Sequence, residues 1–165
     1  MPVSGTIDAT NQNALDTAAA ALFGTATCVD LSGFVTVSGQ SVTSLAALAP
    51  LRSVDGMVTV TNTSVVSIDQ LTRLAHVGGN LEVLDNGDMI AIDLPALVDV
   101  DGGVLVGNNA TLVDVTLGLL ENVAGDLTFT DNPQLCVTAV IQALFDRATL
   151  TVLGTKSQNG NDNGC

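Results

Sequence analysis

The sequence contains few aromatic and few basic residues. Its 165 residues include four Phe, no Trp and no Tyr, although 47% of them are hydrophobic. A core of Val, Leu, Ile and Ala without large rings suits a fold built from thin, similar layers. Four Lys and Arg stand against 17 Asp and Glu, which gives a formal net charge of −13. This imbalance argues against nucleic acid and anionic membrane surfaces as partners, because both require clustered Lys and Arg.

Long hydrophobic runs and familiar enzyme motifs are also missing. No apolar run approaches the roughly 18 residues of a membrane-spanning helix, so we expect no membrane insertion. Met1 is followed by Pro-Val-Ser-Gly-Thr-Ile-Asp, which lacks the basic and hydrophobic regions of a signal peptide. We therefore expect either a mature fragment or a domain of a longer protein. A Gly-rich phosphate loop, an HExxH motif and a recognisable Ser/His/Asp arrangement are absent, so we expect neither an enzyme nor a cofactor.

A repeat of 23 residues is the strongest pattern in the chain. The segment beginning Leu51-Arg-Ser-Val-Asp-Gly-Met-Val recurs from Leu74, Leu97 and Leu120, and in weaker form from Cys28. A constant period of this length indicates a solenoid, in which each coil buries its apolar side chains against the next. One glycine per coil keeps the period: Gly33, Gly56, Gly79, Gly102 and Gly125. We expect either positive φ or a close approach of the neighbouring coil there.

The residues after each glycine alternate as in a strand with one buried face. The inward positions are Val35 and Val37, Val58 and Val60, Leu81 and Val83, Val104 and Val106, and Leu127 and Phe129. The residues between them, which point outward, are Thr36, Thr59, Glu82, Leu105 and Thr128. Stacking such strands about 4.8 Å apart builds parallel sheets. A polar corner follows each strand, where Asn86, Asn109 and Asn132 recur with the period and are expected to hydrogen-bond the turn backbone.

The last part of each coil changes character along the chain. In the first two coils the apolar residues fall three apart, which predicts a turn of helix: Val42, Leu45 and Leu48, then Val65, Ile68 and Leu71. In the next two they alternate, which predicts a second strand: Ile90, Ile92 and Leu94, then Val113, Val115 and Leu117.

The two ends of the chain depart from the repeat. Alanine-rich Asn11–Phe23 predicts an N-terminal cap helix that ends at Gly24. The apolar spacing over 134–147 predicts a C-terminal cap helix, with a last strand over 149–153. We expect one domain in three parts: 1–26, a leader or short strand with the cap helix; 27–133, the five coils; and 134–165, the second cap, the last strand and the tail.

The recurring Leu-x-x-Val-x-Gly-x-Leu-x-Val-x-x-Asn resembles the receptor L-domain. That family is a leucine-rich-repeat-like, right-handed parallel β-helix of insulin- and EGF-receptor ectodomains and many bacterial surface proteins. The bacterial members look closer, because Cys28 opens a coil, Asn132–Cys136 reads Asn-Pro-x-Leu-Cys and the Asn-Gly-rich tail ends in Cys165. The resemblance covers roughly residues 11–165 and implies an extracellular, five-coil β-solenoid that binds ligands without catalysis.

The three cysteines leave one unpaired. We expect a disulfide between Cys136 and Cys165, since it would tether the otherwise loose tail across the C-terminal cap. Closing this loop adds roughly 3–4 kcal/mol in the chain-entropy model. Cys28 takes the position of the leading Leu, where a small buried residue is expected, and the alternative is a reactive or intermolecular thiol.

Few polar residues suggest catalysis or metal binding. Asp55 and Asp101 share one repeat position two coils apart, about 10 Å by strand spacing. That separation is slightly wide for a glycosidase carboxylate pair and leaves a polysaccharide-active β-helix enzyme as a minor alternative. Asp85 and Asp88 are weak candidates for Ca²⁺, but their loop lacks the length and terminal Glu of an EF-hand. His76, the single histidine, is expected at the surface, and we expect no metal site.

The function that we expect is a non-enzymatic interaction or adhesion domain, secreted or at the cell surface. Its protein or glycan partner would meet the outward face of a parallel sheet. The candidate partner-binding residues are Met57, Thr59, Glu82, Leu84, Leu105 and Thr128. The main alternative is a structural subunit that self-associates into an array or filament. Ice binding by the column of Thr36, Thr59 and Thr128 is a minor one, because Glu82 and Leu105 interrupt that column.

Overall fold

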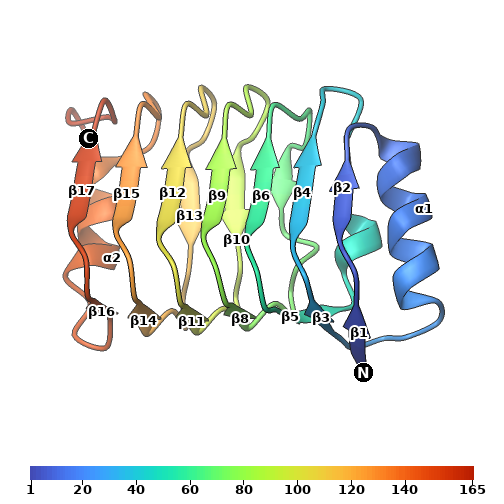
Figure 1. The fold of residues 1–165 in the computed structure, drawn as a ribbon. Coiled ribbons are helices and arrows are strands. Elements are labelled where there is room, and N and C mark those ends of the chain that lie inside the picture. The colour runs from blue at the N-terminus through green and yellow to red at the C-terminus, as the bar shows by residue number, and fades with distance from the viewer.

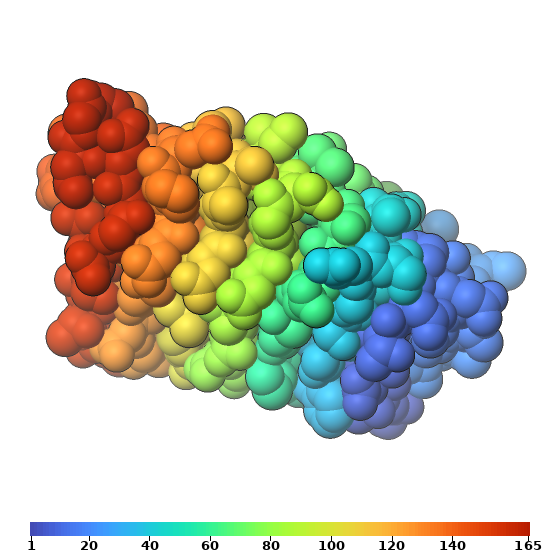
Figure 2. All heavy atoms as spheres, turned by 90° about the horizontal axis from the view of Figure 1, so that it is seen from above, coloured from blue at the N-terminus to red at the C-terminus, as the bar shows by residue number.

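The computed structural model describes all 165 residues as one stack of parallel strands (Figure 1). Two sheets of seven strands and one of three make up the stack, and every strand pairing is parallel. Successive coils form consecutive bands along an elongated molecule (Figure 2). The chain is therefore a parallel β-solenoid, as the repeat predicts.

The three sheets are named here in the order in which the chain enters them. The first contains β1 (Pro2–Ser4), β3 (Val29–Ser32), β5 (Leu51–Val54), β8 (His76–Val77), β11 (Asp99–Val100), β14 (Asn122–Val123) and β16 (Thr151–Val152). The second contains β2 (Ile7–Ala9), β4 (Val35–Ser38), β6 (Val58–Thr61), β9 (Leu81–Leu84), β12 (Val104–Gly107), β15 (Leu127–Thr130) and β17 (Lys156–Asn159). The third contains β7 (Ser67–Ile68), β10 (Ala91–Asp93) and β13 (Asp114–Thr116).

The register of the second sheet stacks equivalent residues of successive repeats. Val104 of β12 lies between Leu81 of β9 and Leu127 of β15. Every inward position predicted in this sheet, from Val35 to Phe129, is at least 96% buried. These side chains form one continuous aliphatic core with those of the other sheets. Each coil therefore hides its apolar side chains against its neighbours.

The glycine row lies where successive coils come closest. The Gly56 amide donates to the Gly33 carbonyl at 2.7 Å, and a Cβ on Gly56 would lie 2.6 Å from that oxygen. Close approach, and not positive φ, therefore explains the row. Positive φ occurs later in each coil, at the polar corner after the strand of the second sheet, where Asn and Asp tolerate it. The residues concerned are Asn62, Asp85, Asn108 and Asp131.

The polar corner contains a ladder of buried asparagines. Asn86, Asn109 and Asn132 are fully buried. The side-chain amide of Asn109 donates to the Val83 carbonyl at 3.0 Å and to Asn132 Oδ1 at 3.1 Å. Its Oδ1 accepts from the Asn86 backbone amide at 3.0 Å. The ladder thus satisfies backbone groups that no sheet reaches.

The third side of the coil differs from the prediction for the second repeat. Val65–Leu71 does not form a helical turn, because Ser67 and Ile68 pair with Ala91 and Ile92 as β7. Sheet hydrogen bonds to the next coil therefore outweigh the local spacing. Of the two predicted helical turns, only the first forms, as the 3₁₀ helix η1 (Ala46–Leu48).

Two apolar residues of the third side that were predicted to point inward point outward. Ile90 and Val113 are 48% and 43% exposed, while Met89 and Leu112 beside them are fully buried. The corner before β10 and β13 turns the chain so that Met89 and Leu112 contact the core. The buried alternation starts at Ile92 and Val115, so the prediction that it starts at Ile90 and Val113 is wrong by two residues.

Helices lie at both ends of the stack (Figure 1). At the N-terminal end, α1 (Gln12–Phe23) packs beside β2 and buries Leu15, Ala19 and Phe23. Asn11 starts this helix by accepting from the Ala14 amide at 2.9 Å. At the other end the helical segment is shorter than 134–147. It comprises η2 (Val137–Gln142), which has π-type hydrogen bonding, and α2 (Ala143–Phe145).

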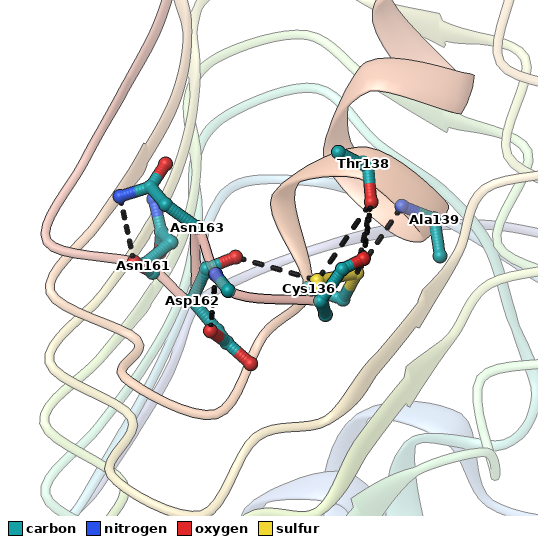
Figure 3. Close-up of a disulfide and its surroundings, with 8 residues drawn as sticks. Cys136, Thr138, Ala139, Asn161, Asp162 and Asn163 are labelled. Atoms are coloured by element: carbon teal, nitrogen blue, oxygen red, sulfur yellow. Dashed lines mark hydrogen bonds between the residues drawn. A yellow bond between two sulfur atoms is a disulfide. The ribbon is translucent and has the colours of Figure 1, made fainter.

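The C-terminal tail is held in place by a disulfide and a strand. Cys136, at the start of η2, is bonded to Cys165, and Thr138 Oγ1 donates to the Cys165 carbonyl at 2.9 Å (Figure 3). Within the tail, β17 pairs with β15, which the sequence did not predict. The helical insertion makes this last coil longer, because Leu127 pairs with Lys156, 29 residues later.

Cys28 is half-buried, so the prediction that it replaces a buried leading Leu is wrong. A β-bulge between β3 and β5 shifts the register. As a result Val29, which is fully buried, pairs with Leu51. Cys28 lies outside the core with a free thiol.

Candidate functional site

Equivalent positions on the outer face of the second sheet differ in chemistry from one coil to the next. The inward columns of this sheet are aliphatic from β4 to β12 and end in Leu127 and Phe129 on β15. The outward column between them reads Asp8, Thr36, Thr59, Glu82, Leu105, Thr128 and Ser157. Core packing does not require this variation, so the outer face is free to carry a binding site.

A hollow of about 330 Å³ lies on this face around Gly103. Gly103 has no side chain, whereas the equivalent residues of the neighbouring coils are Asn80 and Asp126. Half-buried Leu105 supplies most of the apolar lining, and Glu82 and Thr128 complete the polar border. The missing side chain of one repeat therefore creates a depression with polar walls.

Hydrogen bonds fix one wall of the hollow. Asn80 Oδ1 accepts from the Gly103 amide at 3.0 Å. Asn80 Nδ2 donates to Glu82 Oε1 at 3.1 Å, and Thr59 Oγ1 donates to Glu82 Oε2 at 3.4 Å. The Glu82 carboxylate is thus oriented before any ligand arrives.

Asp126 forms the opposite wall. One of its carboxylate oxygens accepts from the Thr155 amide at 2.7 Å and from the Thr155 hydroxyl at 2.9 Å. These hydrogen bonds, the backbone one first, lower the pKa of Asp126. The hollow therefore presents two carboxylates on either side of an apolar residue. Such a site can accept hydrogen bonds from a cationic or hydroxyl-bearing group.

The predicted partner-binding residues are spread more widely than the hollow. Glu82, Leu105 and Thr128 border it. Leu84 is half-buried on the same strand as Glu82, and Met57 is 37% exposed further toward the N-terminus. Thr59 is only 7% exposed and contributes through its bond to Glu82.

Five residues of the hollow were not among the predicted partner-binding ones. Val104 and Gly125 were predicted only as parts of the repeat, and Asn80, Gly103 and Asp126 were not singled out at all. A signal for them exists in the sequence. Gly102 belongs to the glycine row, but Gly103 after it lies outside that row, in a column where the other residues have side chains.

The outer face of the first sheet contains an Arg–Asp ion pair and a His–Asp contact. Arg52 donates to both Asp30 carboxylate oxygens, at 2.8 and 2.6 Å. These bonds, with one from Ser53, lower the pKa of Asp30 to about 2. His76 lies at the surface, with Nε2 3.6 Å from Asp101 Oδ2. Asp55 takes no part in this contact.

The remaining acidic candidates lie at the polar corner. Asp85 and Asp131 are two of the residues with positive φ, and Asp85 and Asp88 are exposed. Nowhere in the structure do three His, Cys, Asp or Glu side chains form a group that could hold a metal ion. No helix combines the length and apolar character needed to cross a membrane.

Comparison with known proteins gives a family and no individual relative. No curated protein and no solved structure was found to match the chain. The sequence model of the family described as "Receptor L domain" matches residues 27–145, more than half of the chain. Receptor L domains are extracellular, non-enzymatic, ligand-binding domains, and the disulfide fits that setting. The parallel solenoid and this match lead to one conclusion: the chain belongs to the receptor L domain family.

Proposed function

We propose that this protein is a secreted or cell-surface domain that binds a partner on the outer face of its second sheet. The observation that carries the proposal is the hollow at Gly103, with carboxylates on two sides and Leu105 in its lining. The binding contacts would come from Asn80, Glu82 and Asp126. Binding alone would be the activity of the domain.

A protein partner with an exposed Lys or Arg fits this hollow best. The cationic head would lie between Glu82 and Asp126, and its aliphatic stem would cover Leu105. The net charge of −13 would speed the approach of such a partner. A glycan would use the same acceptors, but the hollow has no aromatic side chain on which a sugar ring could stack.

We also propose that the domain acts as a closed unit of five 23-residue coils, over 27–133, between terminal caps. Its N-terminal segment, 1–26, includes α1 and adds β1 and β2 to the sheets. Its C-terminal segment, 134–165, includes the edge strand β17, where exposed Lys156 donates to the Phe145 carbonyl. A charged residue on an edge strand discourages further strand addition. These features favour a binding module over a subunit of an array.

The test is to select ligands and compare variants. A random-peptide phage library and a glycan array would be screened with the intact domain, and selected ligands then titrated against Leu105→Asp and Glu82→Ala. We expect peptides rich in Lys or Arg, whose binding Leu105→Asp abolishes and Glu82→Ala weakens about tenfold. Leu153→Asp is the matched control, because Leu153 is 77% exposed and lies outside the hollow.

Three outcomes would overturn parts of the proposal. Unchanged affinity of Leu105→Asp would remove the hollow as the binding site. Selection of glycans alone would replace the protein partner by a glycan. Growth of the sedimentation coefficient with concentration would favour the array.

A further inference from the structure

A second apolar surface lies on the third sheet, which is behind the second sheet in Figure 1. Val66, Ile90 and Val113 are 51%, 48% and 43% exposed. The Ile90 amide donates to the Val66 carbonyl at 2.8 Å, and the Val113 amide donates to the Ile90 carbonyl at 3.0 Å. The three residues therefore form one ladder across adjacent coils, which is called here the aliphatic ladder.

Acidic residues surround the aliphatic ladder. Asp88 precedes Ile90 in the chain and is exposed, and Asp93 follows it on β10. Asp114, next to Val113, and Asp69, beyond β7, are exposed as well. A partner of this surface must therefore offer both apolar contact and positive charge.

A second copy of this chain cannot easily supply that charge. All four of its basic side chains are already engaged: Arg52 with Asp30, Arg73 with the Thr27 carbonyl, Arg147 with carbonyls including that of Leu117, and Lys156 with the Phe145 carbonyl. Two copies would place acidic borders against each other. The partner is therefore a different polypeptide.

The spacing of the aliphatic ladder indicates the form of that polypeptide. Two steps between adjacent strands cover about 10 Å. Seven residues of α-helix rise by about the same length, so the apolar residues i, i+3 or i+4, and i+7 fall in step with three strands. Backbone hydrogen bonds fix the ladder, so such a helix would meet a preformed surface.

We infer that the aliphatic ladder of Val66, Ile90 and Val113 is a docking surface for a basic amphipathic helix of another polypeptide. The apolar stripe of that helix lies along the ladder, and its Lys or Arg residues face Asp88, Asp93 and Asp114. This surface lies on a different sheet from the hollow at Gly103. One domain can therefore bind two partners at once, or one partner at two places.

The experiment uses the full chain and three synthetic peptides. The first is a Leu/Lys helix with leucine at i, i+3 and i+7. The second keeps those leucines and replaces each Lys by Glu, and the third scrambles the first. Each peptide is titrated against the Leu105→Asp chain, in which binding at the hollow is removed. We expect only the first to bind by calorimetry, to weaken with added salt, and to shift the amide NMR signals of residues 66–69, 90–93 and 113–116.

Variants separate this surface from the hollow. Ile90→Ser should weaken binding of the first peptide about tenfold, and the exposed position makes this change compatible with folding. Leu153→Ser, the control, should leave the affinity unchanged. Equal binding of the three peptides, no binding, or an unaffected Ile90→Ser would overturn the inference. So would dimerisation of the chain that Ile90→Ser abolishes, which would identify a second copy as the occupant.

Discussion

The buried polar corner and the outer face of the second sheet follow the same period and differ in how strictly they repeat. The corner column reads Thr63, Asn86, Asn109, Asn132 and Asn161, with side-chain hydrogen bonds from one coil to the next. The outer column changes from hydroxyl to carboxylate to aliphatic between Thr59, Glu82 and Leu105. Side chains that join one coil to the next are determined by folding, whereas those that face solvent are free to acquire a function.

The inside of the second sheet should respond most strongly to truncation. Leu127 is fully buried, so Leu127→Ala should lower the free energy of unfolding by roughly 2–5 kcal/mol through lost burial and a cavity. Glu82→Ala, on the outer face, should change it by no more than about 0.5 kcal/mol. Urea unfolding followed by circular dichroism measures both, and equal effects would abolish the distinction between inside and outside.

Removing the disulfide should loosen the C-terminal end of the asparagine ladder and leave the middle of that ladder intact. The loop between Cys136 and Cys165 is closed by that bond, and opening it should cost about 3–4 kcal/mol in the chain-entropy model. Hydrogen exchange of a Cys136→Ser/Cys165→Ser variant should speed up over 154–165 and remain slow around Asn109. Faster hydrogen exchange along the whole chain would show that the tail does not unfold separately from the coils.

Breaking the asparagine ladder in its centre should lower the free energy of unfolding somewhat less than removing the disulfide. Asn109→Ala leaves the Val83 carbonyl and the Asn86 amide buried without these partners. The free energy of unfolding should fall by about 2–3 kcal/mol. Thr36→Ala, on the half-buried outer face, is the control. If both variants unfold at the same urea concentration, the ladder contributes no more than a surface residue.

The smallest effect is expected from acid at the Asp30–Arg52 pair. The folded-state pKa of Asp30, about 2, is below its ordinary value of 3.8, because the carboxylate accepts bonds from Arg52 and Ser53. Its stabilising contribution is therefore complete above about pH 4 and is lost as the pH falls toward 2. The difference in stability between wild type and Asp30→Asn should shrink over that range, as measured by urea unfolding at several pH values. A difference that is constant with pH would contradict the shift.

The repeated parts of this protein are the parts that its sequence predicts well. The parallel solenoid and the inward columns follow from one period of 23 residues, because each coil meets the same neighbour in the same way. The row of Asn86, Asn109 and Asn132 was visible for the same reason. Asn161 was not, because the inserted helix moves it 29 residues from Asn132.

The parts that depend on local register were not predictable in this way. The bulge that removes Cys28 from the core and the strand β7 at Ser67–Ile68 result from pairing with the next coil, which no local pattern encodes. The hollow at Gly103 depends on what is missing from one coil relative to its neighbours. The chemistry of a partner leaves no periodic signal in the chain.

The central claim, that backbone meets backbone along the glycine row, is tested most directly by comparing two glycine substitutions. A Cβ at Gly56 would lie 2.6 Å from the Gly33 carbonyl oxygen, whereas one at Gly118 would meet nothing within 4 Å. The unfolding free energy of Gly56→Ala should fall by about 1–3 kcal/mol through overpacking, and that of Gly118→Ala should not fall. Equal stability of the two variants would contradict the stacking of coils on which the fold and both proposed surfaces depend.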